Sequence, residues 1–137
     1  ATVGGVPIWS LSYGLSVRAN SGEGSGCVAA ALSSRQEVLA LHIGEDGVPS
    51  VNLYGHGRGL TKYRRSERRI DDGEWHELVV THQGGNGQTV LYVDGLPAVT
   101  GDMTEGTTDE FSTFVLGGGF GARPSPAAAD YRDWQVW

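Results

Sequence analysis

The chain has 137 residues, of which 39% are hydrophobic and 19% are charged, so it is long and apolar enough to form one folded domain. Its formal net charge of −6 argues against general binding to nucleic acid or to anionic membrane surfaces. No apolar run in the sequence approaches the roughly 18 residues that cross a bilayer. The 22 glycines are about twice the usual share and predict many tight turns between short strands.

The first part of the chain alternates with a period of two, which is typical of strands with one buried face. Leu15, Val17 and Ala19 fall on one side of such a strand, with polar residues between them. The run Gly26–Leu32 is small and apolar throughout, as in a strand that is covered on both sides. Cys27 lies in this run, and we expect it to be a small buried hydrophobe; a single cysteine excludes an internal disulfide.

Two further strands are predicted at Val38–Ile43 and Pro49–Tyr54. The dipeptide Asp46-Gly47 lies between them and is a strong hairpin signal. The segment from His56 to Arg69 then loses the alternation and carries most of the positive charge. It is predicted to be a long surface loop with a short strand near Leu60–Tyr63, and its basic residues are Arg58, Lys62, Arg64, Arg65, Arg68 and Arg69.

Alternation returns in the second half, where Trp75, Glu77, Val79 and Thr81 face one way and His76, Leu78, Val80 and His82 face the other. Glycine-rich turns and a polar loop separate the remaining segments. The further predicted strands are Thr89–Val93, Leu96–Val99, Thr113–Leu116 and Tyr131–Trp137.

No segment has helical periodicity over three turns. The strands and their regular turn signals therefore predict an all-β chain that folds as an antiparallel β-sandwich of jelly-roll type. Residues 1–137 are expected to form a single domain, excised from a larger secreted protein whose targeting signal lies elsewhere.

The stretch from Asp71 to Gly95, DDGEWHELVVTHQGGNGQTVLYVDG, closely resembles the core signature of laminin-G/concanavalin A-like domains. In this signature we expect Trp75 to bridge the two sheets and anchor the core. Either His76 or Glu77 should tether a neighbouring loop. The turn after Tyr92-Val93 should need a positive φ, which Gly95 tolerates.

Within that superfamily the order of the segments is most similar to the family 40 carbohydrate-binding modules, the lectin domains that precede sialidase catalytic domains. Strands of that family are resembled by four segments, Gly14–Arg18, Val48–Gly55, Thr113–Gly118 and Asp133–Trp137. The resemblance implies a concanavalin A-like fold, a secreted parent enzyme, and binding of a glycan such as sialic acid or another acidic sugar. The glutamate and arginine that contact sialic acid in the family are replaced here by Asn52 and Tyr54.

Catalytic groups are not evident in the sequence, so the domain is expected to be non-catalytic. Glucanases of similar fold carry closely spaced carboxylates on one strand face, and this chain has no such run. The four histidines have no spacing typical of a zinc site. A structural calcium ion is a further hypothesis, because loop carboxylates are available at Asp102, Asp109, Glu110 and Asp130.

A sugar site needs an aromatic ring for the sugar face and planar polar groups for its hydroxyls. Two adjacent arginines, such as Arg64 and Arg65, would suit an acidic sugar. The competing interpretations are that Lys62–Arg69 is merely a solvated basic loop, and that the domain is a protein–protein adhesion or spacer module. The candidate ligand-binding residues are Tyr54, His56, Arg58, Tyr63, Arg64 and Arg65 in the first loop, and Phe120, Arg123 and Tyr131 near the end.

Overall fold

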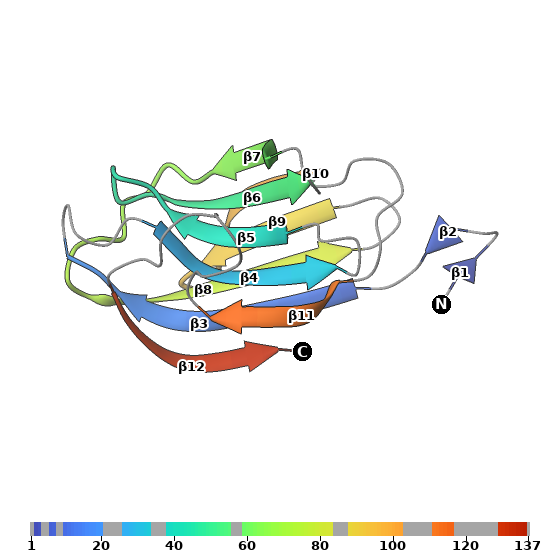
Figure 1. The fold of residues 1–137 in the computed structure, drawn as a ribbon. Helices are drawn as coiled ribbons and strands as arrows, with labels where there is room; N and C mark the ends of the chain where they lie inside the picture. Colours follow the sequence, from blue (N-terminus) through green and yellow to red (C-terminus); the bar gives the residue numbers. More distant parts are fainter. Residues whose placement is uncertain are drawn as a thin grey trace.

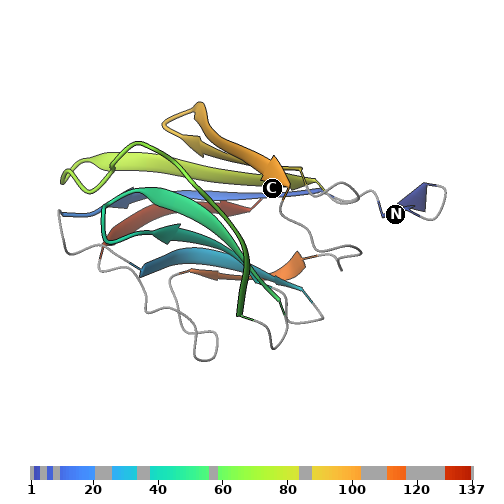
Figure 2. The ribbon, with the colours of Figure 1, turned by 90° about the horizontal axis from the view of Figure 1, so that it is seen from above.

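The computed structural model describes residues 2–3, 6–7, 10–20, 26–33, 38–55, 59–83, 88–102, 111–116 and 129–136. These residues form two five-stranded antiparallel sheets that lie face to face (Figures 1 and 2). Sheet I has the spatial order β10 (Leu96–Asp102), β9 (Gln88–Val93), β8 (Trp75–Gln83), β3 (Ser10–Arg18) and β12 (Asp130–Val136). Sheet II has the order β11 (Phe111–Leu116), β4 (Gly26–Ser33), β5 (Val38–Ile43), β6 (Pro49–Gly55) and β7 (Gly59–Arg65).

The predicted all-β jelly-roll sandwich is confirmed by this arrangement. A separate two-stranded ribbon, β1 (Thr2–Val3) with β2 (Val6–Pro7), was not foreseen from the sequence. The described ranges contain no helix, and hence none long and apolar enough to cross a membrane.

The alternation seen in the sequence sets which side chains enter the core. In β8 the residues His76, Leu78, Val80 and His82 are buried, whereas Glu77 is exposed. The inner faces of both sheets contribute to one hydrophobic cluster, which holds Tyr13, Leu15, Val17, Val28, Ala29, Ala31, Leu39, Leu41, Ile43, Val51, Leu53, Ile70, Leu78, Val80, Leu91 and Val93.

Tyr13 joins the two sheets by a polar contact inside this cluster. Its side chain is fully buried, and its hydroxyl donates to the carbonyl oxygen of Leu39 on β5 over 3.0 Å. The rings of Phe114 and Trp134 pack beside it, with centroids 6.1 and 5.8 Å away. Burial raises the pKa of the Tyr13 hydroxyl, so the group stays protonated and remains a donor.

The turn predictions hold where the structure describes them. Gly47 has a φ of +76° in the β5–β6 hairpin, and a Cβ there would lie 2.2 Å from the Asp71 carboxylate. In the turn after β9, Asp94 and Gly95 have φ values of 52° and 82°, the left-handed pair that suits a two-residue hairpin. Cys27 is a free, fully buried thiol, as expected.

The sequence assignment of Trp75 to the core was wrong. Trp75 pairs with Arg18 on the outer face of sheet I and is only partly buried. Its neighbour His76 faces inward, and because side chains alternate along a strand, Trp75 must face outward. There it is covered by cations: the guanidinium carbons of Arg18 and Arg132 lie 4.9 and 3.9 Å from the ring centroid.

The prediction of a long loop between His56 and Arg69 was also wrong in part, because Gly59–Arg65 forms the whole of strand β7. Backbone bonds to β6 hold this strand, and they do not depend on side-chain polarity. Charged residues are common on such edge strands, since they discourage pairing with another chain. Basic composition therefore hid a strand instead of marking a loop.

The Tyr13 contact gives a stability prediction. Tyr13→Phe should lower the free energy of unfolding by about 1–2 kcal/mol, because it removes a buried hydrogen bond between the sheets and keeps the ring packing. Urea denaturation of this variant measures the loss. Tyr63→Phe is the matched control, since the Tyr63 side chain is exposed and should change stability little; equal effects in both variants would contradict the prediction.

Candidate functional site

A groove of about 500 Å³ crosses the outer face of sheet I over β8, β3 and β12, which are neighbours in Figure 1. Its lining combines hydroxyl, carboxylate and amide groups with a few apolar atoms. The lining residues are Ser12, Gly14, Leu15, Ser16, Glu77, Val79, Thr81, Asp133 and Gln135.

Strand register places these side chains in cross-strand rows. Ser16 on β3 lies opposite Glu77 on one side and Arg132 on the other. One step along, Gly14 lies opposite Val79 and Gln135. Within the groove the outward-facing residues of β3 are the small Ser12, Gly14 and Ser16, whereas β8 and β12 contribute larger side chains such as Glu77 and Gln135.

Gly14 lies in the floor of the groove where β3 and β8 approach closely. A Cβ added there would lie 2.8 Å from the carbonyl oxygen of Leu78 and 2.9 Å from Cγ2 of Val79. The first of these atoms belongs to the backbone of the adjacent strand and cannot swing aside. Close strand packing, and not a turn, therefore requires glycine at this position.

A bulge in β12 shapes the opposite wall. The register shifts between Arg132 and Gln135, and Asp133 has a φ of 58° in the left-handed region, which aspartate tolerates better than most residues. Trp134 packs against the core, while Asp133 and Gln135 line the groove. The extra residue thus adds a carboxylate to the outer face without losing the inward aromatic ring.

Glu77 is held by the turn that follows β9. Its backbone N–H donates to Oδ1 of Asp94 over 2.9 Å, and its carbonyl accepts from the backbone N–H of Asp94 over 2.8 Å. The exposed Glu77 carboxylate therefore extends from a fixed backbone into the groove.

Ion pairs surround Trp75 beside the Glu77 end of the groove. Arg18 donates twice to Oδ2 of Asp130, over 2.8 and 3.1 Å, and Nε of Arg132 lies 3.5 Å from Oδ2 of Asp133. Both guanidinium groups also lie over the Trp75 ring. The cations nearest the groove are thus already paired with carboxylates and an aromatic face.

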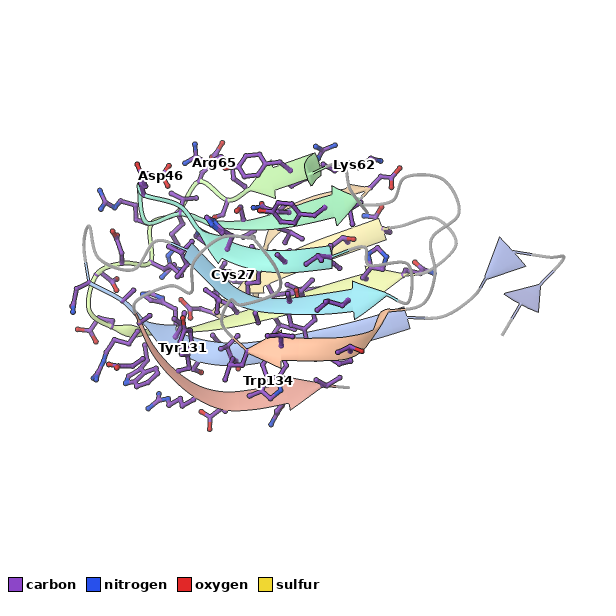
Figure 3. The ribbon with its side chains drawn as sticks, in the orientation of Figure 1. Cys27, Asp46, Lys62, Arg65, Tyr131 and Trp134 are labelled. Atoms are coloured by element: carbon purple, nitrogen blue, oxygen red, sulfur yellow. The ribbon has the colours of Figure 1, made fainter. Side chains whose placement is uncertain are left out.

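The candidate residues named from the sequence do not form one site. Tyr63 and Arg65 share the outer face of β7, opposite the buried Asn52 and Ser50 of β6. Arg65 forms an ion pair with Asp46, and Figure 3 shows the two side chains at the same end of sheet II.

Arg64 faces the other side of β7, because it is adjacent to Arg65 along an extended strand. It lies against β10, where a Cβ on Gly101 would be 2.9 Å from its Nε. Arg64 and Arg65 therefore extend from opposite sides of β7.

The remaining described candidates, Tyr54 and Tyr131, lie in different sheets. Tyr54 is buried on β6, where its hydroxyl oxygen accepts from Nδ2 of Asn52 over 3.3 Å. Tyr131 is half-buried on β12 and packs against the core. His56, Arg58, Phe120 and Arg123 lie outside the described residues.

His76 has the tethering role expected from the sequence. Its two ring nitrogens lie 2.8 Å from Oδ1 of Asp72 and 2.8 Å from Oδ2 of Asp94, so it links the segment before β8 to the turn after β9. Burial opposes the charged ring, but the two carboxylates outweigh burial and raise the pKa of His76. The same contacts hold the pKa values of Asp72 and Asp94 below their usual range.

His82 lies inside the sandwich, where its Nδ1 is 2.6 Å from Oγ1 of Thr89. Burial lowers the pKa of His82 to about 4, so its ring is neutral at ordinary pH. Among the described residues no three histidine, cysteine or carboxylate side chains lie close enough together to hold a metal ion.

The calcium ligands proposed from the sequence are divided by the fold. Asp102 ends β10 and pairs with Lys62, while Asp130 begins β12 and pairs with Arg18. These strands are the opposite edges of sheet I, so the two carboxylates cannot share one ion. Asp109 and Glu110 lie outside the described residues.

Sequence reasoning missed the groove. The signal in β3 was present, since Ser12, Gly14 and Ser16 are the small residues that alternate with the core positions. The residues that complete the groove come from β8 and from the end of the chain. Only the sheet order brings these three strands together.

The sequence of this chain is similar to those of known proteins. A family model described as the concanavalin A-like lectin/glucanases superfamily matches residues 9–137. Neurexin 1 of Drosophila melanogaster is 34% identical over 73 residues, which are 51% of this chain and 4% of that protein.

Two solved structures resemble the fold. A SAP-like heptameric pentraxin from Limulus polyphemus superposes with a TM-score of 0.67 and 19% identity, over 96% of this chain and 65% of that one. Domain 4 of AbnA, a GH43 extracellular arabinanase from Geobacillus stearothermophilus solved with arabinotriose, gives 0.61 and 18%, over 97% and 62%. The chain spans less than two thirds of each of these three proteins.

The His76 contacts predict how stability depends on pH. A folded-state pKa raised above the ordinary value of 6.5 means that the stabilisation is complete below pH 6.5 and is lost as pH rises through the raised value. The lowered pKa of His82 changes stability only below pH 6.5, so its contribution does not overlap with that of His76. The free energy of unfolding should therefore fall as the pH rises above 6.5.

Urea denaturation over this range measures the effect, and His76→Gln should be less stable at pH 6.5 and should lose the pH dependence. His42→Gln serves as the control, because burial lowers the pKa of His42 and the variant should keep the decline above pH 6.5. A flat profile for the unmodified chain would contradict the prediction.

Proposed function

The chain belongs to the concanavalin A-like lectin/glucanases superfamily, and from this premise we propose that it is a non-catalytic carbohydrate-binding module whose glycan lies in the groove of sheet I. The groove itself carries the proposal. It is an open, mixed-polarity depression in which hydroxyl, carboxylate and amide groups converge over a floor of small residues. Sugar hydroxyls are matched by such groups, which accept and donate in several directions.

The mechanism of such a module is attachment. A domain that holds its parent enzyme beside a polysaccharide raises the local substrate concentration through the connecting chain. Domain 4 of AbnA supports this use of the fold, since it is part of an extracellular arabinanase and was solved with arabinotriose. We infer a secreted parent glycoside hydrolase for this domain, with sialidases among the candidates.

Sialic acid is a weaker candidate ligand than glycans in general. In family 40 modules a glutamate and an arginine make the contacts, and here Asn52 and Tyr54 occupy the matching positions, buried and hydrogen-bonded to each other. A structural calcium ion remains part of the proposal, but it would use Asp102 or Asp130 separately, each with other oxygen ligands.

A second candidate function is protein–protein adhesion. The similarity to Neurexin 1 concerns 73 residues, 4% of that protein, and does not distinguish adhesion from glycan binding. The two functions differ in their expected ligand. An adhesion module should bind no glycan, and removal of groove side chains should not change its binding to a protein partner.

A glycan array with a blocked-groove variant tests the proposal. The domain should bind at least one class of oligosaccharide. Ser16→Tyr fills the centre of the groove and should weaken that binding at least about tenfold, because each hydrogen bond that is lost removes about 1 kcal/mol of binding free energy. Thr113→Tyr, on β11 of the other sheet, is the matched control and should bind normally.

Two results would count against the proposal. Absence of binding to every glycan on the array would favour the adhesion function. Release of reducing ends from any polysaccharide, abolished in Glu77→Gln or Asp133→Asn, would instead make the domain an enzyme that uses the two carboxylates of the groove.

A further inference from the structure

We propose that the groove of sheet I selects neutral oligosaccharide chains and rejects acidic ones. This inference rests on the proposed glycan-binding function and specifies the chemistry of its ligand. It replaces the acidic sugar expected from the sequence. It is based on the charged residues that line the groove, on the ion pairs of the nearby arginines, and on the spacing of the side chains along β3.

The described residues that line the groove carry negative charge. Among the described residues of the lining, Glu77 and Asp133 are the ionisable ones, and both are carboxylates on exposed side chains. An acidic sugar lying there would bring a third carboxylate between them. Like charges that approach while losing water repel each other, and no lysine or arginine among the described residues is part of this lining to compensate.

The two cations beside the groove do not alter this balance. Arg18 is hydrogen-bonded to Asp130 through two of its nitrogens, and Arg132 lies next to Asp133. Both also lie over the Trp75 ring. To clamp an incoming carboxylate, either guanidinium would have to leave its carboxylate and the aromatic ring, and breaking those interactions would offset the attraction to the ligand.

Hydrogen bonding favours a neutral ligand rich in hydroxyls. Carboxylates only accept hydrogen bonds, and each can accept from two neighbouring hydroxyls. Gln135 can donate and accept, and so can the hydroxyls of Ser12, Ser16 and Thr81. A neutral sugar supplies donors to every one of these groups, and hydrogen bonds to charged acceptors are the stronger ones.

The small residues along β3 indicate the length and the direction of the ligand. Ser12, Gly14 and Ser16 are two residues apart along β3, so at about 3.3 Å per residue the floor runs for roughly 13 Å along the strand. This exceeds the width of one sugar ring. An oligosaccharide should therefore lie parallel to β3 and bind more tightly than a monosaccharide does.

The basic strand β7 does not provide a rival two-arginine clamp in the described residues. Arg64 and Arg65 face opposite sides of the strand, and Arg65 is paired with Asp46. Lys62 in the middle of the same strand is paired with Asp102 of sheet I, and Figure 3 shows it away from Arg65 and Asp46.

Isothermal titration with matched oligosaccharides tests the inference. The probes are neutral arabino-, galacto- and gluco-oligosaccharides of one to five units, and acidic oligogalacturonates and sialyllactose. We expect at least tenfold tighter binding of one neutral series than of the acidic probes, affinity that rises with chain length, and little change between 50 and 500 mM salt.

The double variant Glu77→Gln, Asp133→Asn separates charge from shape. Both replacements keep the side-chain size, and asparagine tolerates the left-handed backbone at position 133. Neutral ligands should bind more weakly, and the ratio of neutral to acidic affinity should fall at least tenfold. Glu67→Gln, an exposed carboxylate outside the groove, should leave the ratio unchanged.

The outcomes distinguish this inference from the proposed function. Stronger binding of an acidic probe, abolished in Arg65→Ala and kept in Ser16→Tyr, would overturn the inference and leave glycan binding standing on another surface. Neutral binding that Ser16→Tyr does not weaken would overturn the groove as its site. Absence of binding to all probes would remove the proposed function itself.

Discussion

The two-residue periodicity of β3 and its pairing with β8 is the constraint on which the rest of the structure depends. Along β3, Tyr13, Leu15 and Val17 enter the core, and the residues between them form the floor of the groove. A slip of one residue would exchange the two sets and bury serines while exposing the aromatic and aliphatic side chains. Core and groove are thus two consequences of one register.

Polar contacts on the inner and the outer face of sheet I reinforce this strand register. Inside, the Tyr13 hydroxyl links sheet I to the backbone of β5. Outside, Asp94 binds the ring of His76 and the backbone of Glu77, and it also pairs with Arg68 over 3.2 Å. Because His76 points inward and Glu77 outward, this single carboxylate fixes the start of β8 with respect to both faces.

Much of the fold was predictable because its signals are local. The alternation in β8 and the turns at Asp46-Gly47 and Asp94-Gly95 depend on neighbouring residues, and they occur as expected. Trp75 was misassigned because its size suggests burial, whereas its position in the register puts it outside with Arg18 and Arg132.

The candidate site was not predictable for a different reason. It joins β3 and β8 to β12, which follows more than 50 residues after β8 begins, and a bulge at Asp133 breaks the alternation that would have assigned its faces. The basic residues of β7 attracted attention through their number, but chain neighbours on a strand face apart.

The close approach at Gly14 divides the groove into a part that can change and a part that cannot. Any side chain at position 14 meets the backbone of β8, so replacement there disturbs the sandwich as well as the ligand. Glu77, Thr81 and Gln135 on the walls do not appear in the core cluster. Divergence among related domains, and libraries built to retarget this one, should therefore accumulate new specificities along the walls while the central glycine is retained.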